Sequence, residues 1–260
     1  MVNADFFSSK ISSLKRWYKN IYDLKGKTVE LFNDELVVKT FDYLNKNLKK
    51  NFIQKYSNDK EVLFALQKNV NIFSLFKNHN EQKEIASLLT KNGKIIAYKE
   101  FEKAALKISV NYNRNWLKAE FNTVTEQAKL TAYWNKIDRQ KKRYPYLQYI
   151  TRDDNKVRQE HQEFNGLVLP VSHSFWNTNF PVNGFNCRCT VRQLTKKQAE
   201  KIGITKKKNI ETYSSKFNFN AGKEQKIFGE NHNYFKDIPT ETQKLLNEYA
   251  EVSAKEKKRW

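Results

Sequence analysis

Apolar residues recur at three- and four-residue steps through the first fifty residues of the chain. One run extends from residue 6 to residue 24, and a second follows Asn33 as far as Lys55. This spacing puts the apolar side chains on one face of an α-helix, and asparagine often caps helix N-termini. The sequence therefore predicts two amphipathic helices, whose buried faces carry Phe7, Ile11, Leu14, Trp17, Tyr18 and Ile21, and Leu36, Val37, Phe41, Leu44, Leu48 and Phe52.

Shorter helices are expected next. Ser57 is a candidate cap for a helix that ends at Leu66, and Asn80 for a helix that ends at Leu89, where Asn92-Gly93 provides a left-handed terminus. Residues 1–108 therefore read as an N-terminal helical region. A long helix is predicted over residues 115–134, and the charged run 138–143 followed by Pro145 predicts a loop or a frayed helix end.

The second half of the chain is rich in turns. Residues 146–151 and 166–171 are short aromatic and β-branched runs that suit strands. A capped helix is predicted over residues 195–203, and a last helix from Thr240, which has Gln243 in capping-box register. The expected fold class is predominantly helical α+β, with an N-terminal helical region (1–108), a small turn-rich α+β module (109–225) and a C-terminal helical extension (226–260).

The charge of the chain indicates the class of partner. Lys and Arg total 48 against 28 Asp and Glu, a net charge of +20. A basic surface attracts phosphates through counterion release, so nucleic acid is the leading candidate, although a Lys- and Asn-rich composition also arises from an AT-rich genome. No run of about 20 apolar residues occurs, and no apolar core of a secretory signal, so we expect no membrane contact and synthesis in the cytoplasm.

Chemistry-bearing residues gather between residues 149 and 194. This stretch holds an acidic pair, a Val-Arg dipeptide, a histidine, a glycine, an aromatic pair, a proline and the triplet Cys-Arg-Cys. We expect a single structural motif formed by Asp153, Asp154, Arg158, His161, Gly166, Trp176, Pro181, Cys187, Arg188 and Cys189.

In order and spacing, this motif resembles the phage Mu protein F-like family of head morphogenesis proteins. Two further segments are similar to the family: the helix around Ala119-Glu120, and residues 217–222, where Ala221 stands in place of the family's proline. The resemblance covers about residues 110–225. It implies a minor capsid protein of a tailed phage or prophage, located in the capsid interior or at the portal vertex after synthesis in the host cytoplasm. It also implies portal and capsid proteins as partners.

Cysteine and histidine in the motif are residue types that bind zinc. His161, Cys187 and Cys189 are candidate ligands, and His173 is a candidate for the fourth. The C-x-C spacing is tighter than the usual C-x-x-C and favours the alternative, in which buried cysteines and a hydrogen-bonded histidine form a structural knot. No cofactor is certain from the sequence, and zinc is the one cofactor for which candidate ligands occur.

We predict that the protein is not an enzyme. Asp153, Asp154, Glu160 and His161 include the groups that metal-dependent phosphodiester cleavage needs, but no nucleophile elbow and no glycine-rich phosphate loop accompanies them. A nuclease or toxin-type enzyme is the alternative from another class. A nucleic-acid-binding protein outside the virion is the third possibility.

Two basic clusters are candidates for contact with double-stranded DNA. They consist of Arg139, Lys141, Lys142 and Arg143, and of Lys206, Lys207 and Lys208. The alternative for each is a solvated charge run, because positive charge is spread along the whole chain.

Overall fold

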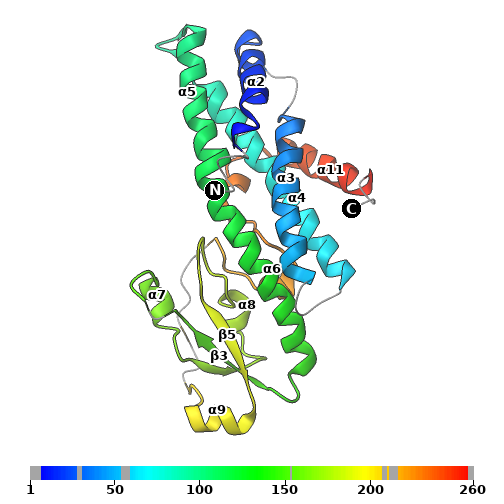
Figure 1. Ribbon diagram of the computed structural model, residues 1–260, viewed down its shortest axis with the longest axis vertical. Coiled ribbons are helices and arrows are strands. Elements are labelled where there is room, and N and C mark those ends of the chain that lie inside the picture. The colour runs from blue at the N-terminus through cyan, green and yellow to red at the C-terminus, as the bar shows by residue number, and fades with distance from the viewer. Residues whose placement is uncertain are drawn as a thin grey trace. The chain divides into compact units, whose positions relative to one another are not determined.

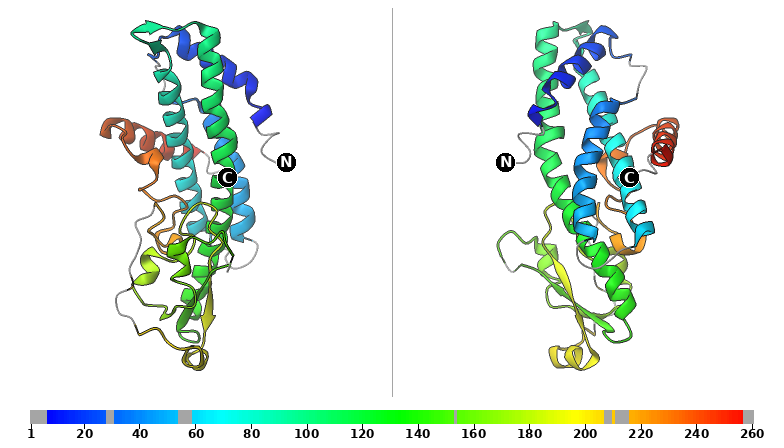
Figure 2. Two further views of the ribbon diagram at one scale, coloured as in Figure 1. Left: turned by 90° about the vertical axis from the view of Figure 1, so that its left-hand side faces the viewer. Right: turned by 45° about the vertical axis from the view of Figure 1, so that its right-hand side comes forward.

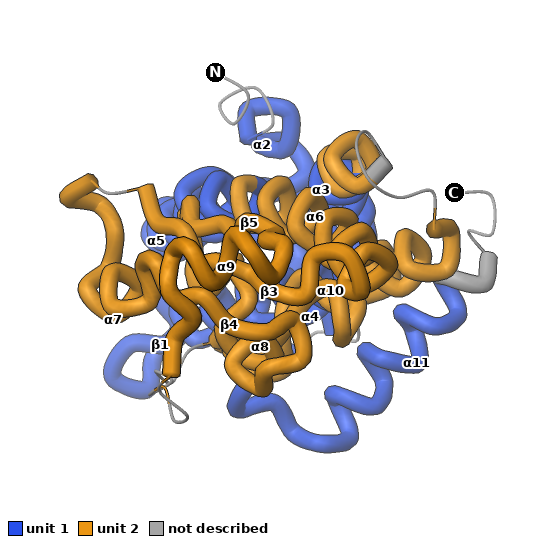
Figure 3. Tube along the Cα trace, turned by 90° about the horizontal axis from the view of Figure 1, so that it is seen from below, with its two compact units in different colours: residues 1–45, 70–121, 234–260 blue, residues 46–69, 122–233 orange. Residues whose placement is uncertain are grey.

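The computed structural model describes residues 7–27, 31–53, 59–152, 154–206, 210 and 216–256. They form two compact units, each built from segments distant in sequence. Unit 1 comprises residues 1–45, 70–121 and 234–260, and unit 2 comprises residues 46–69 and 122–233 (Figure 3). The sequence predicts three consecutive regions instead, with boundaries at residues 108 and 225. That division stays a prediction.

Helices dominate both units. In chain order they are α2 (Ile11–Asp23), α3 (Asp34–Ile53), α4 (Lys60–Ser87), α5 (Tyr98–Val110), the π-helix η1 (Asn111–Trp116), α6 (Leu117–Gln140), α7 (Gln159–Gln162), α8 (Phe175–Thr178), α9 (Lys196–Ile202), α10 (Ala221–Glu224), the 3-10 helix η2 (Asn233–Phe235) and α11 (Thr240–Glu256) (Figure 1). The strands are β1 (Thr90–Lys91), β2 (Lys94–Ile95), β3 (Tyr146–Ile150), β4 (Val168–Pro170) and β5 (Thr190–Leu194). The predominantly helical α+β class is confirmed. No described helix is both long and apolar enough to span a bilayer.

The first two predicted helices are confirmed as α2 and α3. Asn33 caps α3, because its side-chain oxygen accepts a hydrogen bond of 3.0 Å from the Leu36 backbone N–H. The apolar face of α2 packs in one core with Phe101 and Ala105 of α5. The two helices lie side by side (Figure 2). Buried faces in register with the helical period, rather than helix propensity alone, stabilise these helices.

The prediction of two short helices after residue 57 is wrong, because α4 is one continuous helix. Ser57 lies outside the described residues, and Asp59 instead accepts a hydrogen bond of 3.1 Å from the Val62 backbone N–H. Asn80, expected as a cap, lies inside α4, where its side-chain nitrogen donates to the carbonyl oxygens of Phe76 and Tyr234. Hydrogen bonds within the tertiary structure thus satisfy a polar side chain that, by sequence alone, resembles a helix N-cap.

A two-stranded hairpin interrupts the helical region expected over residues 1–108. Strands β1 and β2 are antiparallel and pair Thr90 with Ile95. Between them Asn92 and Gly93 have φ values of 51° and 73°. Two consecutive positive φ values are the geometry of a tight hairpin turn, so this dipeptide forms the turn of a hairpin and does not itself end α4.

The helix predicted over residues 115–134 is confirmed within a longer helical segment that runs from Tyr98 to Gln140. It ends inside the charged run, where the Arg143 backbone N–H donates to the Gln140 carbonyl oxygen at 2.9 Å. Charged side chains cannot be buried without partners, so the helix ends where its apolar stripe ends.

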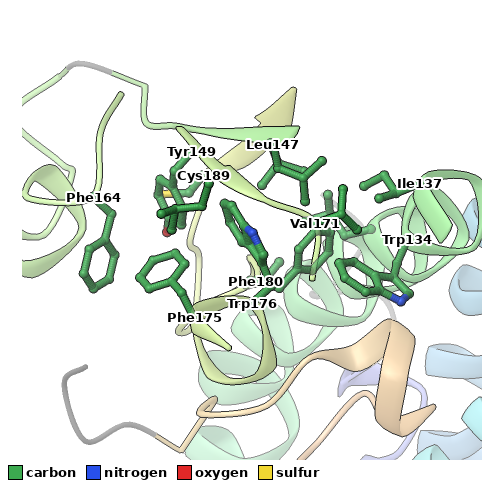
Figure 4. Packing of buried hydrophobic residues seen from close by; sticks show 14 of the residues in the cluster. Trp134, Ile137, Leu147, Tyr149, Phe164, Val171, Phe175, Trp176, Phe180 and Cys189 are labelled. Atoms are coloured by element: carbon green, nitrogen blue, oxygen red, sulfur yellow. The ribbon is translucent and has the colours of Figure 1, made fainter. Parts of the chain in front are cut away.

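Unit 2 contains a three-stranded antiparallel sheet with the strand order β4-β3-β5. Two of its strands, β3 and β4, were predicted, whereas β5 was not. Leu147 and Tyr149 of β3 point into a core that includes Trp134, Ile137 and Trp176 (Figure 4). The sheet gains a buried face in this way, which a short three-stranded sheet needs for stability.

Two predicted helices that follow the sheet are also confirmed. Helix α9 has a complete capping box, in which the Thr195 hydroxyl accepts from the Gln198 backbone N–H and the Gln198 side chain accepts from the Thr195 backbone N–H. Helix α11 begins at Thr240, as expected.

Candidate functional site

The predicted motif converges in unit 2, where α7 faces the loop that leads into β5. His161 Nδ1 lies 3.7 Å from Cys187 Sγ and 3.6 Å from Cys189 Sγ. All three side chains are buried, and their possible ligand atoms lie within 4.8 Å of one another. Because 26 and 28 residues separate the histidine from the cysteines, the tertiary fold creates this group.

An ion pair joins the acidic end of the motif to its cysteine end. Arg188 Nη1 donates to Asp154 Oδ2 at 2.7 Å, and Nη2 donates to Oδ1 at 2.6 Å. These hydrogen bonds are the main cause that lowers the pKa of Asp154 to about 2. The two-pronged geometry fixes orientation as well as distance. Asp153, the other acidic residue of the motif, lies outside the described residues.

Arg158 also contacts the loop that precedes Cys187. Its Nη2 donates to the Phe185 carbonyl oxygen at 2.8 Å. Gly184 has a φ of 151°, and a Cβ atom there would lie 3.0 Å from Arg158 Nη1. Asn186 has a φ of 57°, a left-handed conformation that asparagine tolerates better than most residues. The backbone before Cys187 is thus shaped by residues that allow this close approach.

The two cysteines of the site differ electrostatically. The hydrogen bond from Cys189 is the main cause that lowers the pKa of the Cys187 thiol, and the contact with His161 adds to it against the effect of burial. The same hydrogen bond and burial raise the pKa of Cys189. Loss of a proton is therefore easier at Cys187 than at Cys189.

His173 does not join the other three candidate ligands. Its Nδ1 accepts a hydrogen bond of 3.1 Å from the Phe175 backbone N–H at the start of α8. Among the described residues, the group that can hold a metal ion consists of His161, Cys187 and Cys189.

The remaining motif residues pack around the site. Trp176 is fully buried, donates from Nε1 to the Pro170 carbonyl oxygen at 2.9 Å, and stacks with its ring plane 10° from that of Tyr149 (Figure 4). Gly166 has a φ of 82°, and its backbone N–H donates to the Tyr149 carbonyl oxygen at 2.9 Å. Pro181 is buried. These positions hold the strand and turn that flank the histidine.

Three residues outside the predicted motif also hold the module together. Asn220 caps α10 through its side-chain oxygen, and its side-chain nitrogen donates to the Trp176 carbonyl oxygen at 2.9 Å. A Cβ atom at Gly222 would lie only 2.3 Å from Trp134 Cβ. Residues 217–222, noted earlier for their family resemblance, thus pack against the core, and Trp134 gave no signal beyond its helical spacing.

The acidic residues considered for catalysis do not converge on one metal-binding group in the described part of the chain. Asp154 is bonded to Arg188. Glu160 lies on α7 and lines a cavity of about 330 Å³ together with His161 and Arg158. No carboxylate belongs to the group of described residues that can hold a metal ion around His161.

The first predicted DNA-binding cluster lies at the end of α6 and in the turn that follows. Its four side chains are exposed. Lys141 forms an ion pair of 2.9 Å with Asp138, and the Arg143 guanidinium lies 5.4 Å from the centre of the Tyr144 ring. In the second cluster Lys206 is exposed, whereas Lys207 and Lys208 lie outside the described residues.

Comparison with known proteins places this site within a recognised family region. Residues 82–192 match the family described as "Phage Mu protein F like protein". Over 61 residues, 24% of this chain, the sequence is 39% identical to "Putative capsid assembly protein F" of Escherichia phage Mu. Over 90 residues, 32% of this chain, it is 27% identical to "Mu-like prophage FluMu F protein" of Haemophilus influenzae. The chain spans 14% and 21% of the length of these relatives, and no solved structure matches it significantly.

Proposed function

Residues 82–192 belong to the phage Mu protein F-like family, and from this premise we propose that the protein acts in the assembly of a tailed-phage head. The observation that carries the proposal is the 39% identity to a relative named as a capsid assembly protein. The matched region includes the motif from Asp154 to Cys189. Its described members form a cross-braced module, the kind of rigid element that positions an assembly contact.

The finer proposal is a minor capsid protein associated with the portal vertex or the head interior, with portal and capsid proteins as its partners. Mass spectrometry of purified particles from a producing strain tests this directly. The protein is expected in the particles at low copy number, and affinity capture of the full chain from the same strain is expected to retain the portal protein. Particles that lack the chain in a strain that expresses it would contradict the virion role and favour a protein that binds nucleic acid outside the virion.

The role proposed for the motif is structural, not enzymatic. Cys187→Ser and His161→Ala are expected to lower stability, because each removes a buried polar contact. Incubation of the wild-type chain with plasmid DNA and with RNA, in the presence of Mg²⁺, Mn²⁺ or Zn²⁺, is expected to leave both substrates intact. Cleavage by the wild-type chain that a folded His161→Ala variant lacks would establish the nuclease alternative.

DNA contact is the second part of the proposal, supported by the net charge of +20 and by the exposure of Arg139, Lys141, Lys142 and Arg143. The C-terminal end of a helix also favours cations, which suits the position of Arg139. Removing Lys142 and Arg143 together should weaken DNA binding and reduce the slope of log K against log salt by about 1–2.

A charge-matched variant provides the control for this measurement. Lys91→Ala/Lys94→Ala removes two exposed lysines from the hairpin of unit 1 and leaves residues 139–143 intact. An equal loss of salt dependence in both double variants would show that binding follows total charge and not the proposed cluster.

A further inference from the structure

The distances around His161 match those of a metal centre. Zinc binds cysteine sulfur at about 2.3 Å and histidine nitrogen at about 2.0–2.1 Å, so a nitrogen and a sulfur at a tetrahedral angle lie about 3.5 Å apart. The His161 Nδ1 distances to the two sulfurs are 3.6 and 3.7 Å. We propose that His161, Cys187 and Cys189 bind one zinc ion, which joins α7 to the loop before β5.

The surroundings of the sulfurs favour a bound thiolate. Backbone N–H groups of Asn183 and Cys189 donate hydrogen bonds to Cys187 Sγ, and the Tyr149 hydroxyl bonds to Cys189 Sγ. Asn183 in turn donates to the Tyr149 hydroxyl at 3.3 Å. Hydrogen bonds of this kind orient metal ligands and hold them against rotation.

Positive charge also lies beside the sulfurs, because Arg158 and Arg188 line the cavity that adjoins the three ligands. Two thiolates and one Zn²⁺ have no net charge, so the ion can occupy a buried position without an uncompensated charge.

A small cavity adjoins the three ligands and defines the fourth position. Its volume is about 10 Å³, and its lining includes His161, Cys187 and Cys189 together with Arg158 and Arg188. This is room for about one water molecule, so the fourth ligand is solvent and His173 is not required. The ion joins α7 to the loop before β5, and its role is therefore to fix the motif.

Zinc content tests the ligand set. The full chain is produced with a tag that contains no histidine, in zinc-supplemented medium, and measured by inductively coupled plasma mass spectrometry. Wild type and His173→Ala are expected to hold about one zinc per chain. Cys187→Ser, Cys189→Ser and His161→Ala are expected to lose at least about 90% of it, since only two of the three protein ligands then remain.

Two measurements on the wild-type chain avoid dependence on variants that fail to fold. Replacement of zinc by Co²⁺ is expected to produce a sulfur-to-cobalt charge-transfer band in the near ultraviolet. Chelation is expected to lower the Tm, which returns on addition of Zn²⁺ and not of Mg²⁺.

The proposal fails if wild type holds no zinc and gives no cobalt band, which leaves a hydrogen-bonded knot of one imidazole and two sulfurs. It also fails if His173→Ala loses zinc as Cys187→Ser does, since the ligand set would then differ. Neither result bears on presence in the phage particle, so the head-assembly role is tested separately.

Discussion

Lys77 and Glu120 form an ion pair inside unit 1, with each side chain only 2% exposed. Glu120 also accepts a hydrogen bond of 3.0 Å from the Tyr234 hydroxyl. Two charges this deeply buried are tolerated only because they compensate each other, and loss of one partner leaves the other charge without compensation. The pair links α4 to α6 within the unit and has no signature in the sequence.

Removal of one member of this pair should be strongly destabilising. Glu120→Gln is expected to lower the free energy of unfolding by about 3–5 kcal/mol, whereas the double variant Lys77→Met/Glu120→Leu should recover much of that loss. Urea unfolding followed by circular dichroism measures both. The exposed pair between Lys129 and Glu126 provides the control, since Lys129→Ala should cost less than about 1 kcal/mol. If Glu120→Gln and Lys129→Ala lower the free energy of unfolding equally, the buried pair contributes no more to stability than the exposed pair.

Glu81 should make the stability of unit 1 depend on pH. Burial raises its pKa to about 7, against hydrogen bonds from Ser109 and Asn113 and the charges of Lys77 and Lys10. Between pH 4.5 and 7 the folded state keeps a proton that the unfolded state has lost, so this contribution to stability is complete below pH 4.5 and is lost as the pH rises to 7. The free energy of unfolding of Glu81→Gln, minus that of wild type, should therefore increase across this window by up to about 1.4 kcal/mol per pH unit.

Glu35→Gln is the matched control for this titration. The hydrogen bond from Lys39 is the main cause that lowers the pKa of Glu35, so its carboxylate is ionised in both the folded and the unfolded state above about pH 5.5. Its difference from wild type should be flat between about pH 5.5 and 7. If the free energy of unfolding of Glu81→Gln, minus that of wild type, is flat as well, Glu81 does not cause the pH dependence of stability. The window ends at pH 7, because burial lowers the pKa of Lys10 to about 7 and its protonation changes there.

Gly222→Ala should destabilise unit 2 by direct overlap with Trp134. The new methyl group would lie 2.3 Å from Trp134 Cβ, so the backbone must move, at a cost of about 1–3 kcal/mol or more. Gly166→Ala is the comparison, because its φ of 82° is strained for alanine although no atom lies within 4 Å of the new Cβ. Its expected cost is about 1–2 kcal/mol. Thermal unfolding ranks the two, and a larger loss for Gly166→Ala would contradict the steric account.

Thr195→Ala should weaken α9 at its first turn. The alanine removes the hydroxyl that accepts from the Gln198 backbone N–H, a change that costs about 0.5–2 kcal/mol. Amide hydrogen exchange over α9 detects this even where global unfolding does not, and Thr195→Ser should restore protection. Thr190→Ala, an exposed threonine of β5, should leave exchange in α9 unchanged. Similar exchange in the alanine and serine variants at position 195 would argue against the cap.

The sequence was informative wherever local physical chemistry decides the structure. The apolar stripe from Leu36 to Phe52 predicted the buried face of α3, and Asn33 and Thr195 were recognised as caps because a single side chain bonds a nearby backbone N–H. The same kind of reasoning failed at Asn80, where a partner 154 residues away satisfies the side chain inside α4.

The sequence predicted one part of the candidate site, and the tertiary structure decided the other. Residue types and spacing identified His161, Cys187 and Cys189, since zinc and hydrogen-bonding chemistry depends on those groups. Only the tertiary structure brought them within 4.8 Å of one another and placed His173 at the start of α8 instead. Local patterns determine helices, strands and caps through contacts a few residues apart, whereas a buried pair such as Lys77 and Glu120 depends on which distant segments pack together, and no local pattern encodes that.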